Sequence, residues 1–159
     1  TIVLEQGGTG WEKIQSIFSA ARSWGASVPT AYALQSALAL MLATSLAWLW
    51  HSHAAFELKA AALAVASLLA TPYVLDYDLV VLAIAIVFLA RHGLQRGFGP
   101  FEISLLAAAW IMPLLARAVA GASGVPLGLI VMLILYGIVL RRAVLDQAVA
   151  NDTPRIAQA

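Results

Sequence analysis

Residues 30–50 read TAYALQSALALMLATSLAWLW, a run without a single charged side chain. A helix of about 20 mostly apolar residues is long enough to cross the hydrocarbon core of a bilayer. Pro29 stands where a helix can begin, and Trp48 and Trp50 suit the membrane–water interface at the other end. The run therefore predicts a transmembrane helix.

The composition of the whole chain extends this prediction. Of its 159 residues, 62% are hydrophobic and 11% are charged, whereas a soluble domain is about half apolar and about a quarter charged. A globule of this size has too little interior to hide the excess. The net charge of +1 offers no basic face for nucleic acid. Without cysteine, disulfides and thiolate sites are excluded. We expect an all-α, multi-pass membrane protein.

Further apolar segments predict about five spans in total, and the basic residues predict their direction. Short cytoplasmic loops carry an excess of Lys and Arg, which favours an external N-terminus and a cytoplasmic C-terminus. The expected units are an external segment (1–28), a helix bundle (29–142) and a cytoplasmic polar tail (143–159). The added spans are Leu58–Thr71, Tyr77–Ala90, Ile103–Val119 and Val125–Leu140. The expected inside residues are Lys59, Arg91, Arg96, Arg141, Arg142 and Arg155; Lys13, Arg22 and Arg117 are expected outside.

The external segment predicts an amphipathic helix that lies in the membrane interface. Thr9 followed by Glu12 has the spacing of a capping box, and the helix is expected to end near Gly25. Apolar and polar residues separate onto two faces over about four turns. The apolar face holds Trp11, Ile14, Ile17, Phe18, Ala21 and Trp24, and the polar remainder holds Glu12, Lys13, Gln15, Ser16, Ser19 and Arg22.

The most informative polar stretch is TPYVLDYD at residues 71–78. It places Asp76 and Asp78 at the outer mouth of a span, where a carboxylate is costly unless it faces a polar cavity or has a function. Such carboxylates could act as a base, bind a metal or hold sugar hydroxyls, and Tyr73 and Tyr77 could stack on a sugar or a lipid head group. The alternative is that an aspartate caps the helix and the tyrosines form an aromatic belt.

Other polar residues on the predicted outer side are weaker candidates. Glu5 and Gln6 could bind substrate, although loop residues are often polar without a function. Lys13 and Arg22 could pair with a phosphate or with acidic lipid head groups. Arg117 could pair with an aspartate, grip a phosphate or extend to the interface.

Two remaining patterns indicate structure rather than chemistry. His51 and His53 with Glu57 form a sparse set of metal ligands, which we interpret as an interface loop, so we expect no metal site there. Gly124 and Gly128 have the spacing of a helix-packing motif.

Two motifs carry a resemblance to a known family. The residues LEQGG at 4–8, continued by GWEKIQS at 10–16, and TPYVLDYDL at 71–79 together resemble glycosyltransferase family 87. This family consists of polytopic bacterial enzymes related to polyprenol-phosphate-mannose-dependent mannosyltransferases. The second motif is the more specific, and the rest of the chain matches as hydrophobic spans.

The resemblance implies a part of a GT-C fold with an outward-facing active site. Such enzymes transfer a hexose, commonly mannose, from a polyprenyl-phosphate donor to a lipid or glycan acceptor outside the cytoplasmic membrane. The catalytic carboxylate would belong to a loop upstream of Thr1, so the chain is expected to be the C-terminal portion of a longer enzyme and inactive alone. No cofactor beyond the lipid-linked donor is implied, and a divalent metal is left open.

Roles for the candidate residues follow from the same resemblance. Asp76 and Asp78 would bind sugar hydroxyls or orient a cation. Lys13, Arg22 and Arg117 would stabilise the departing phosphate, and the interfacial helix would lie over the route by which the donor arrives from lipid.

Two other classes of protein compete with the enzyme. A transporter or channel segment would use Asp76 and Asp78 for ion or proton binding, although such proteins usually carry charges at mid-span in broken helices. A non-catalytic membrane subunit would tolerate alanine at both aspartates.

Overall fold

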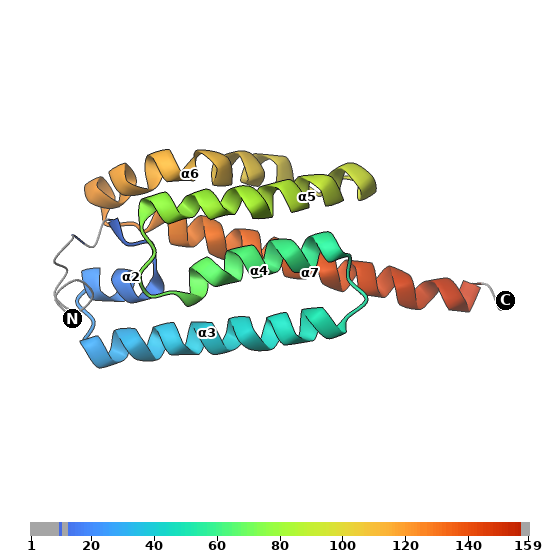
Figure 1. The fold of residues 1–159 in the computed structure, drawn as a ribbon, viewed down its shortest axis with the longest axis horizontal. Coiled ribbons are helices and arrows are strands. Elements are labelled where there is room, and N and C mark those ends of the chain that lie inside the picture. Colours follow the sequence, from blue (N-terminus) through green and yellow to red (C-terminus); the bar gives the residue numbers. More distant parts are fainter. Residues whose placement is uncertain (1–9, 11–12, 157–159) are drawn as a thin grey trace.

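The computed structural model describes residues 10 and 13–156. In this part of the chain the secondary structure is helical, apart from loops and an isolated β-bridge, which confirms the all-α class. Helices α3 to α7 form a bundle, α2 precedes it, and the 3-10 helix η2 leads into α5 (Figure 1). The bounds are α2 Ile17–Ser23, α3 Val28–His51, α4 Phe56–Ala70, η2 Asp76–Val81, α5 Leu82–Arg96, α6 Glu102–Ser123 and α7 Leu127–Ile156.

Successive helices of the bundle run in opposite directions, so the loops gather at two ends (Figure 1). The end beside the N-terminal segment is called the loop end and comprises residues 13–27, 71–81 and 121–126. The opposite end is called the arginine end and comprises residues 52–55, 91–101 and 141–148. An external N-terminus and five alternating spans put three segments on the outer side, at 1–28, 72–78 and 121–124. As far as the structure describes them, these segments lie together at the loop end.

Four helical units are long and apolar enough to cross a bilayer within the described residues. They are α3, the joined η2 and α5, α6, and the first part of α7 as far as Ala148. These units confirm four of the five expected spans and make the chain a multi-pass membrane protein. Helix α7 continues to Ile156, so residues expected to begin a polar tail prolong the last helix instead.

The fifth expected span, α4, is a short central helix. Its 15 residues extend about 22 Å at 1.5 Å per residue, less than the roughly 30 Å of a hydrocarbon core. Leu58, Ala61, Ala62 and Val65 are all fully buried, and α4 packs against α3, α5 and α7. Small residues allow these close approaches, so α4 serves as the centre of the bundle. It ends before Pro72, as predicted.

The N-terminal segment differs from the expected interfacial helix in extent and in position. Helix α2 has only seven residues, and its N-cap is Ser16, whose Oγ accepts a hydrogen bond from the Ser19 amide at 3.1 Å. Thr9 and Glu12 lie outside the described residues. The uncharged part of the expected polar face is buried, because Gln15, Ser16 and Ser19 are each at most 2% exposed. The segment is therefore inserted into the loop end.

Gln35 explains how α2 is held there. This buried side chain lies within α3, where its Nε2 donates to the carbonyl oxygens of Leu69 and Ala70, both at 3.0 Å. Its Oε1 accepts from the Phe18 amide at 3.3 Å. One side-chain amide thus bonds to a backbone N–H in the first turn of α2 and to two carbonyl oxygens in the last turn of α4. Backbone groups at these helix ends have no partner within their own helices.

We predict that Gln35→Leu destabilises the protein by roughly 1–3 kcal/mol, because it leaves a buried amide and two carbonyls without this partner. The measurement is the midpoint of unfolding in detergent. Ser36→Leu changes the next residue of the same helix, which is exposed, and should have little effect. Equal midpoints for the two variants would contradict the assigned role of Gln35.

Candidate functional site

The two motif segments are joined at the loop end by backbone pairing. Ile14 and Leu75 form an antiparallel β-bridge, and the Gln15 amide donates to the Val74 carbonyl oxygen at 2.7 Å. The Ser16 hydroxyl adds a bond to the Pro72 carbonyl oxygen, also at 2.7 Å. Segments far apart in the sequence thereby form one unit.

Gln15 ties this unit to the start of α7. Its Oε1 accepts a hydrogen bond from the Gly128 amide at 3.1 Å. A Cβ at Gly128 would lie 2.9 Å from that oxygen and 3.2–3.3 Å from the Gln15 side-chain carbons, so glycine is what allows the approach. Gly124, with φ of 68°, ends α6 in the left-handed conformation. The Gly124/Gly128 spacing therefore serves a chain turn and a side-chain contact.

The two aspartates have different roles. The Asp78 Oδ2 accepts from the Leu75 amide at 2.9 Å, so this carboxylate caps η2, as in the alternative interpretation of the motif. Asp76 is partly exposed and has no hydrogen bond or ion pair with any residue that the structure describes. Tyr77 is 67% exposed and Tyr73 is partly buried. Asp76 and Tyr77 are the motif side chains available to a ligand.

Of the basic candidates, Lys13 lies nearest to the acidic motif. It precedes the bridge and Asp76 follows it, so antiparallel pairing brings the two residues side by side. Arg22 instead closes the turn after α2, since its Nη1 donates to the Ala26 carbonyl oxygen at 2.6 Å. Arg117 is exposed on α6, one helical turn before Gly121. Glu5 and Gln6 lie outside the described residues.

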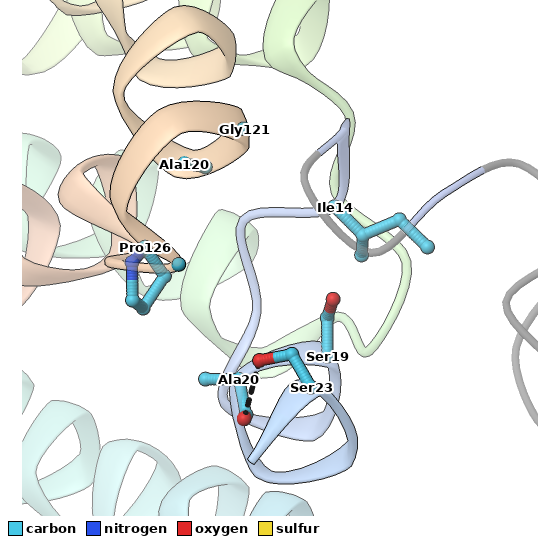
Figure 2. Close-up of a pocket in the computed structure, with 8 residues that line it drawn as sticks. Ile14, Ser19, Ala20, Ser23, Ala120, Gly121 and Pro126 are labelled. Atoms are coloured by element: carbon cyan, nitrogen blue, oxygen red, sulfur yellow. Dashed lines mark hydrogen bonds between the residues drawn. The ribbon is translucent and has the colours of Figure 1, made fainter.

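A pocket of about 370 Å³ opens between α2 and the end of α6. Figure 2 shows Ser19 and Ser23 of α2 on one side, with Ala120 and Gly121 of α6 across from them. The Ser23 hydroxyl donates to the Ala20 carbonyl oxygen at 2.8 Å. We call this the polar pocket, and its lining residues are Ile14, Ser19, Ala20, Ser23, Ala120, Gly121, Gly124 and Pro126.

An apolar groove of about 740 Å³ lies next to the polar pocket. The two hollows share Ala20 and Pro126 as a common wall. The groove lies between α2, Leu34 of α3 and the first turns of α7, and its lining is almost entirely apolar. We call it the apolar groove, and its lining residues are Ile17, Ala20, Ala21, Trp24, Gly25, Ala26, Leu34, Val125, Pro126, Leu129, Ile130 and Leu133.

Comparisons of this chain with protein-family models, curated proteins and solved structures found no match. The resemblance to glycosyltransferase family 87 therefore stays a prediction from the two motifs. The geometry of the loop end is the structural observation from which a function can be argued.

The histidine pattern has a structural explanation at the arginine end. Glu57 pairs with Arg91, Oε1 to Nε at 3.3 Å, and the His51 Nδ1 lies 2.7 Å from the Ala47 carbonyl oxygen. Within the described residues, no three His, Cys, Asp or Glu side chains gather to hold a metal ion.

Sequence reasoning missed the uncharged polar residues that organise the loop end. Gln15, Ser16 and Ser19 were assigned to a water-facing surface, and Gln35 was treated as part of an apolar span. A signal was present, since an amide inside a transmembrane helix usually bonds to a neighbouring helix. Half of the polar stripe of the N-terminal segment is also uncharged, and uncharged groups can be buried when they are hydrogen-bonded.

We predict that the variant Ile14→Cys with Leu75→Cys forms an intramolecular disulfide on mild oxidation. Residues opposite each other in an antiparallel pair have Cα atoms about 4.5–5.5 Å apart, within the range of a disulfide. The chain has no cysteine of its own, so thiol alkylation followed by mass spectrometry reads the result directly. The off-register pair Ile14→Cys with Tyr77→Cys is the control. Equal cross-linking of both pairs would contradict the assigned register.

Proposed function

We propose that this chain is part of a membrane-embedded hexosyltransferase that uses a polyprenyl-phosphate sugar, commonly mannose, on the outer side of the cytoplasmic membrane. The observation that carries the proposal is the apolar groove beside the polar pocket, at the end where both motif segments meet. The family resemblance supports the same reading.

The two hollows suit the two halves of a lipid-linked sugar. A polyprenyl chain is long and apolar, and the lining of the apolar groove includes the exposed side chains of Leu34, Ile130 and Leu133. The sugar-phosphate head needs hydrogen-bonding groups, which the serines of the polar pocket supply. The volume of the polar pocket, about 370 Å³, falls in the range of about 300–1,000 Å³ that small-molecule sites occupy.

The proposed reaction is a direct displacement at the anomeric carbon of the sugar. The acceptor hydroxyl oxygen forms a bond to that carbon while the bond from the carbon to the phosphate oxygen breaks. A carboxylate takes the hydroxyl proton, and the polyprenyl phosphate leaves with the bonding electron pair. The resemblance implies that this carboxylate belongs to an external loop, and we assign the role to no described residue of this chain.

Residues of this chain would bind the donor rather than act as the base. Asp76 would accept hydrogen bonds from sugar hydroxyls, and Tyr73 and Tyr77 would pack on the sugar or on the lipid head group. Lys13, beside Asp76, and Arg117, one turn before the polar pocket, would balance the phosphate charge. Asp78 and Arg22 would keep these groups in place through the loop contacts that they already make.

We predict that Asp76→Asn in the full-length protein lowers sugar transfer from polyprenyl-phosphate mannose about tenfold or more. Hydrogen bonds to a charged group contribute roughly 1.5–3 kcal/mol, and each 1.4 kcal/mol corresponds to a factor of ten. Asp78→Asn retains an oxygen that can accept from Leu75 and should change transfer less. Asp146→Asn, at the arginine end, is the control for a lost carboxylate. Unchanged transfer by the Asp76 variant would remove this residue from the site.

The proposal also requires the loop end to face outward. We predict that Tyr77→Cys in intact cells reacts with a membrane-impermeant maleimide, whereas Phe101→Cys reacts only after permeabilisation. Both side chains are well exposed, at 67% and 85%, so access to the reagent decides the outcome. The reverse pattern would place the motif on the cytoplasmic face, where the donor could not reach it.

A further inference from the structure

A second pocket, at the arginine end, is built from different chemistry. It has a volume of about 290 Å³ and lies between the loop that follows α5 and residues 141–145 of α7. Three arginines and one glutamate contribute to its wall. We call it the basic pocket, and its lining residues are Arg96, Gly97, Phe98, Gly99, Pro100, Glu102, Arg141, Arg142 and Leu145.

Arg142 is held in place by the structure and keeps part of its guanidinium unused. Its Nε donates to the Glu102 Oε1 at 2.6 Å, and its Nη2 contacts the Glu102 Oε2 and donates to the Gly97 carbonyl oxygen at 2.8 Å. The Gly99 amide also donates to Glu102, at 2.8 Å. The Nη1 of Arg142 takes part in none of these bonds, so a fixed cationic donor remains for an anion.

The carboxylates that the structure describes around the basic pocket do not balance its positive charge. Arg96 pairs with Asp146, Nη1 to Oδ1 at 3.2 Å, but its side chain is still 54% exposed. Arg141 is exposed and forms no hydrogen bond or ion pair with any other residue between 13 and 148. Three arginines therefore face two carboxylates, Glu102 and Asp146, which leaves one positive charge for a ligand.

A small, mostly apolar chamber adjoins the basic pocket and holds a buried histidine. Its volume is about 10 Å³, room for about one water, and it shares Glu102 and Arg142 with the basic pocket. His92 lines this chamber and is 1% exposed, yet neither of its ring nitrogens has a hydrogen-bond partner among the described residues. An unpartnered buried polar group is costly, so His92 indicates that this end is arranged for more than packing.

Apolar side chains surround the basic pocket and point to the source of the anion. Phe98 and Leu145 line the pocket and are 37% and 50% exposed, and Phe101, which is 85% exposed, lies between the lining residues Pro100 and Glu102. Phe101 has a φ of 64°, an unusual conformation for a bulky residue, and it presents an aromatic ring where such rings meet the membrane interface. These apolar side chains would add nothing to the binding of a free anion, whereas the acyl chains of a phospholipid would pack against them.

We propose that the basic pocket binds the phosphate of an anionic phospholipid in the leaflet at the arginine end. The phosphodiester lies against Arg141 and the Arg142 Nη1, and the acyl chains lie along Phe98, Phe101 and Leu145. Anionic lipids are concentrated in the cytoplasmic leaflet, where each nearby basic residue adds to the attraction. The proposal does not depend on the sugar-transfer function, which concerns the opposite end.

The test uses the purified full chain in neutral detergent. Native mass spectrometry measures the binding of dioleoyl-phosphatidylglycerol, dioleoyl-phosphatidylcholine and inorganic phosphate, each added alone and in competition. We expect phosphatidylglycerol to bind in preference to phosphatidylcholine, and phosphate at equal concentration not to displace it. Arg141→Gln should weaken phosphatidylglycerol binding about fivefold, as expected from about 1 kcal/mol per basic residue.

Arg91→Gln is the matched control, because it removes an arginine of the same end that is 64% exposed but does not line the basic pocket, and it should leave binding unchanged. Arg141 makes no bond within the described fold, so Arg141→Gln should unfold at the same temperature as the parent chain. Equal lipid binding by the two variants would overturn the site. Full displacement of the lipid by inorganic phosphate would overturn the assignment to a phospholipid.

Discussion

The pairing of Ile14 and Gln15 with Val74 and Leu75 is the contact on which the loop end depends. A membrane bundle can leave the helical conformation near lipid only where the freed backbone groups find partners inside the protein. The bridge supplies such partners for two non-helical segments at once. Around it, Gln35 satisfies the adjoining ends of α2 and α4, so the loops become an ordered surface.

The polar contacts at the two ends of the bundle are made by different kinds of side chain. The loop end uses uncharged amides and hydroxyls, which are less costly to bury than ions when they are bonded. The arginine end uses ion pairs, in which Glu57, Asp146 and Glu102 each face an arginine. This division places uncharged hydrogen-bonding groups beside an apolar groove at one end and surplus positive charge beside a basic pocket at the other.

The close packing of the centre makes both ends possible. Helix α4 is too short to be a conventional span, but its alanines let α3, α5 and α7 approach it closely. Because α4 is short, the chain has room at the loop end for α2 and for the pairing with the motif at 71–79. The missing length of α4 is thus taken up by the segments that line the polar pocket.

Composition and hydrophobic runs determined the class of this protein, since a chain with so few charges is compatible with lipid on every face. They also located the five helices of the bundle, and Pro72 marked the end of α4, because these features act locally along the chain. Tertiary structure alone decided that Gln15, Ser16 and Ser19 are buried, and that Asp78 is a cap while the Asp76 carboxylate has no partner among the described residues. A polar side chain looks the same in the sequence whether it faces water or a backbone group, and only the contact between distant segments distinguishes the two.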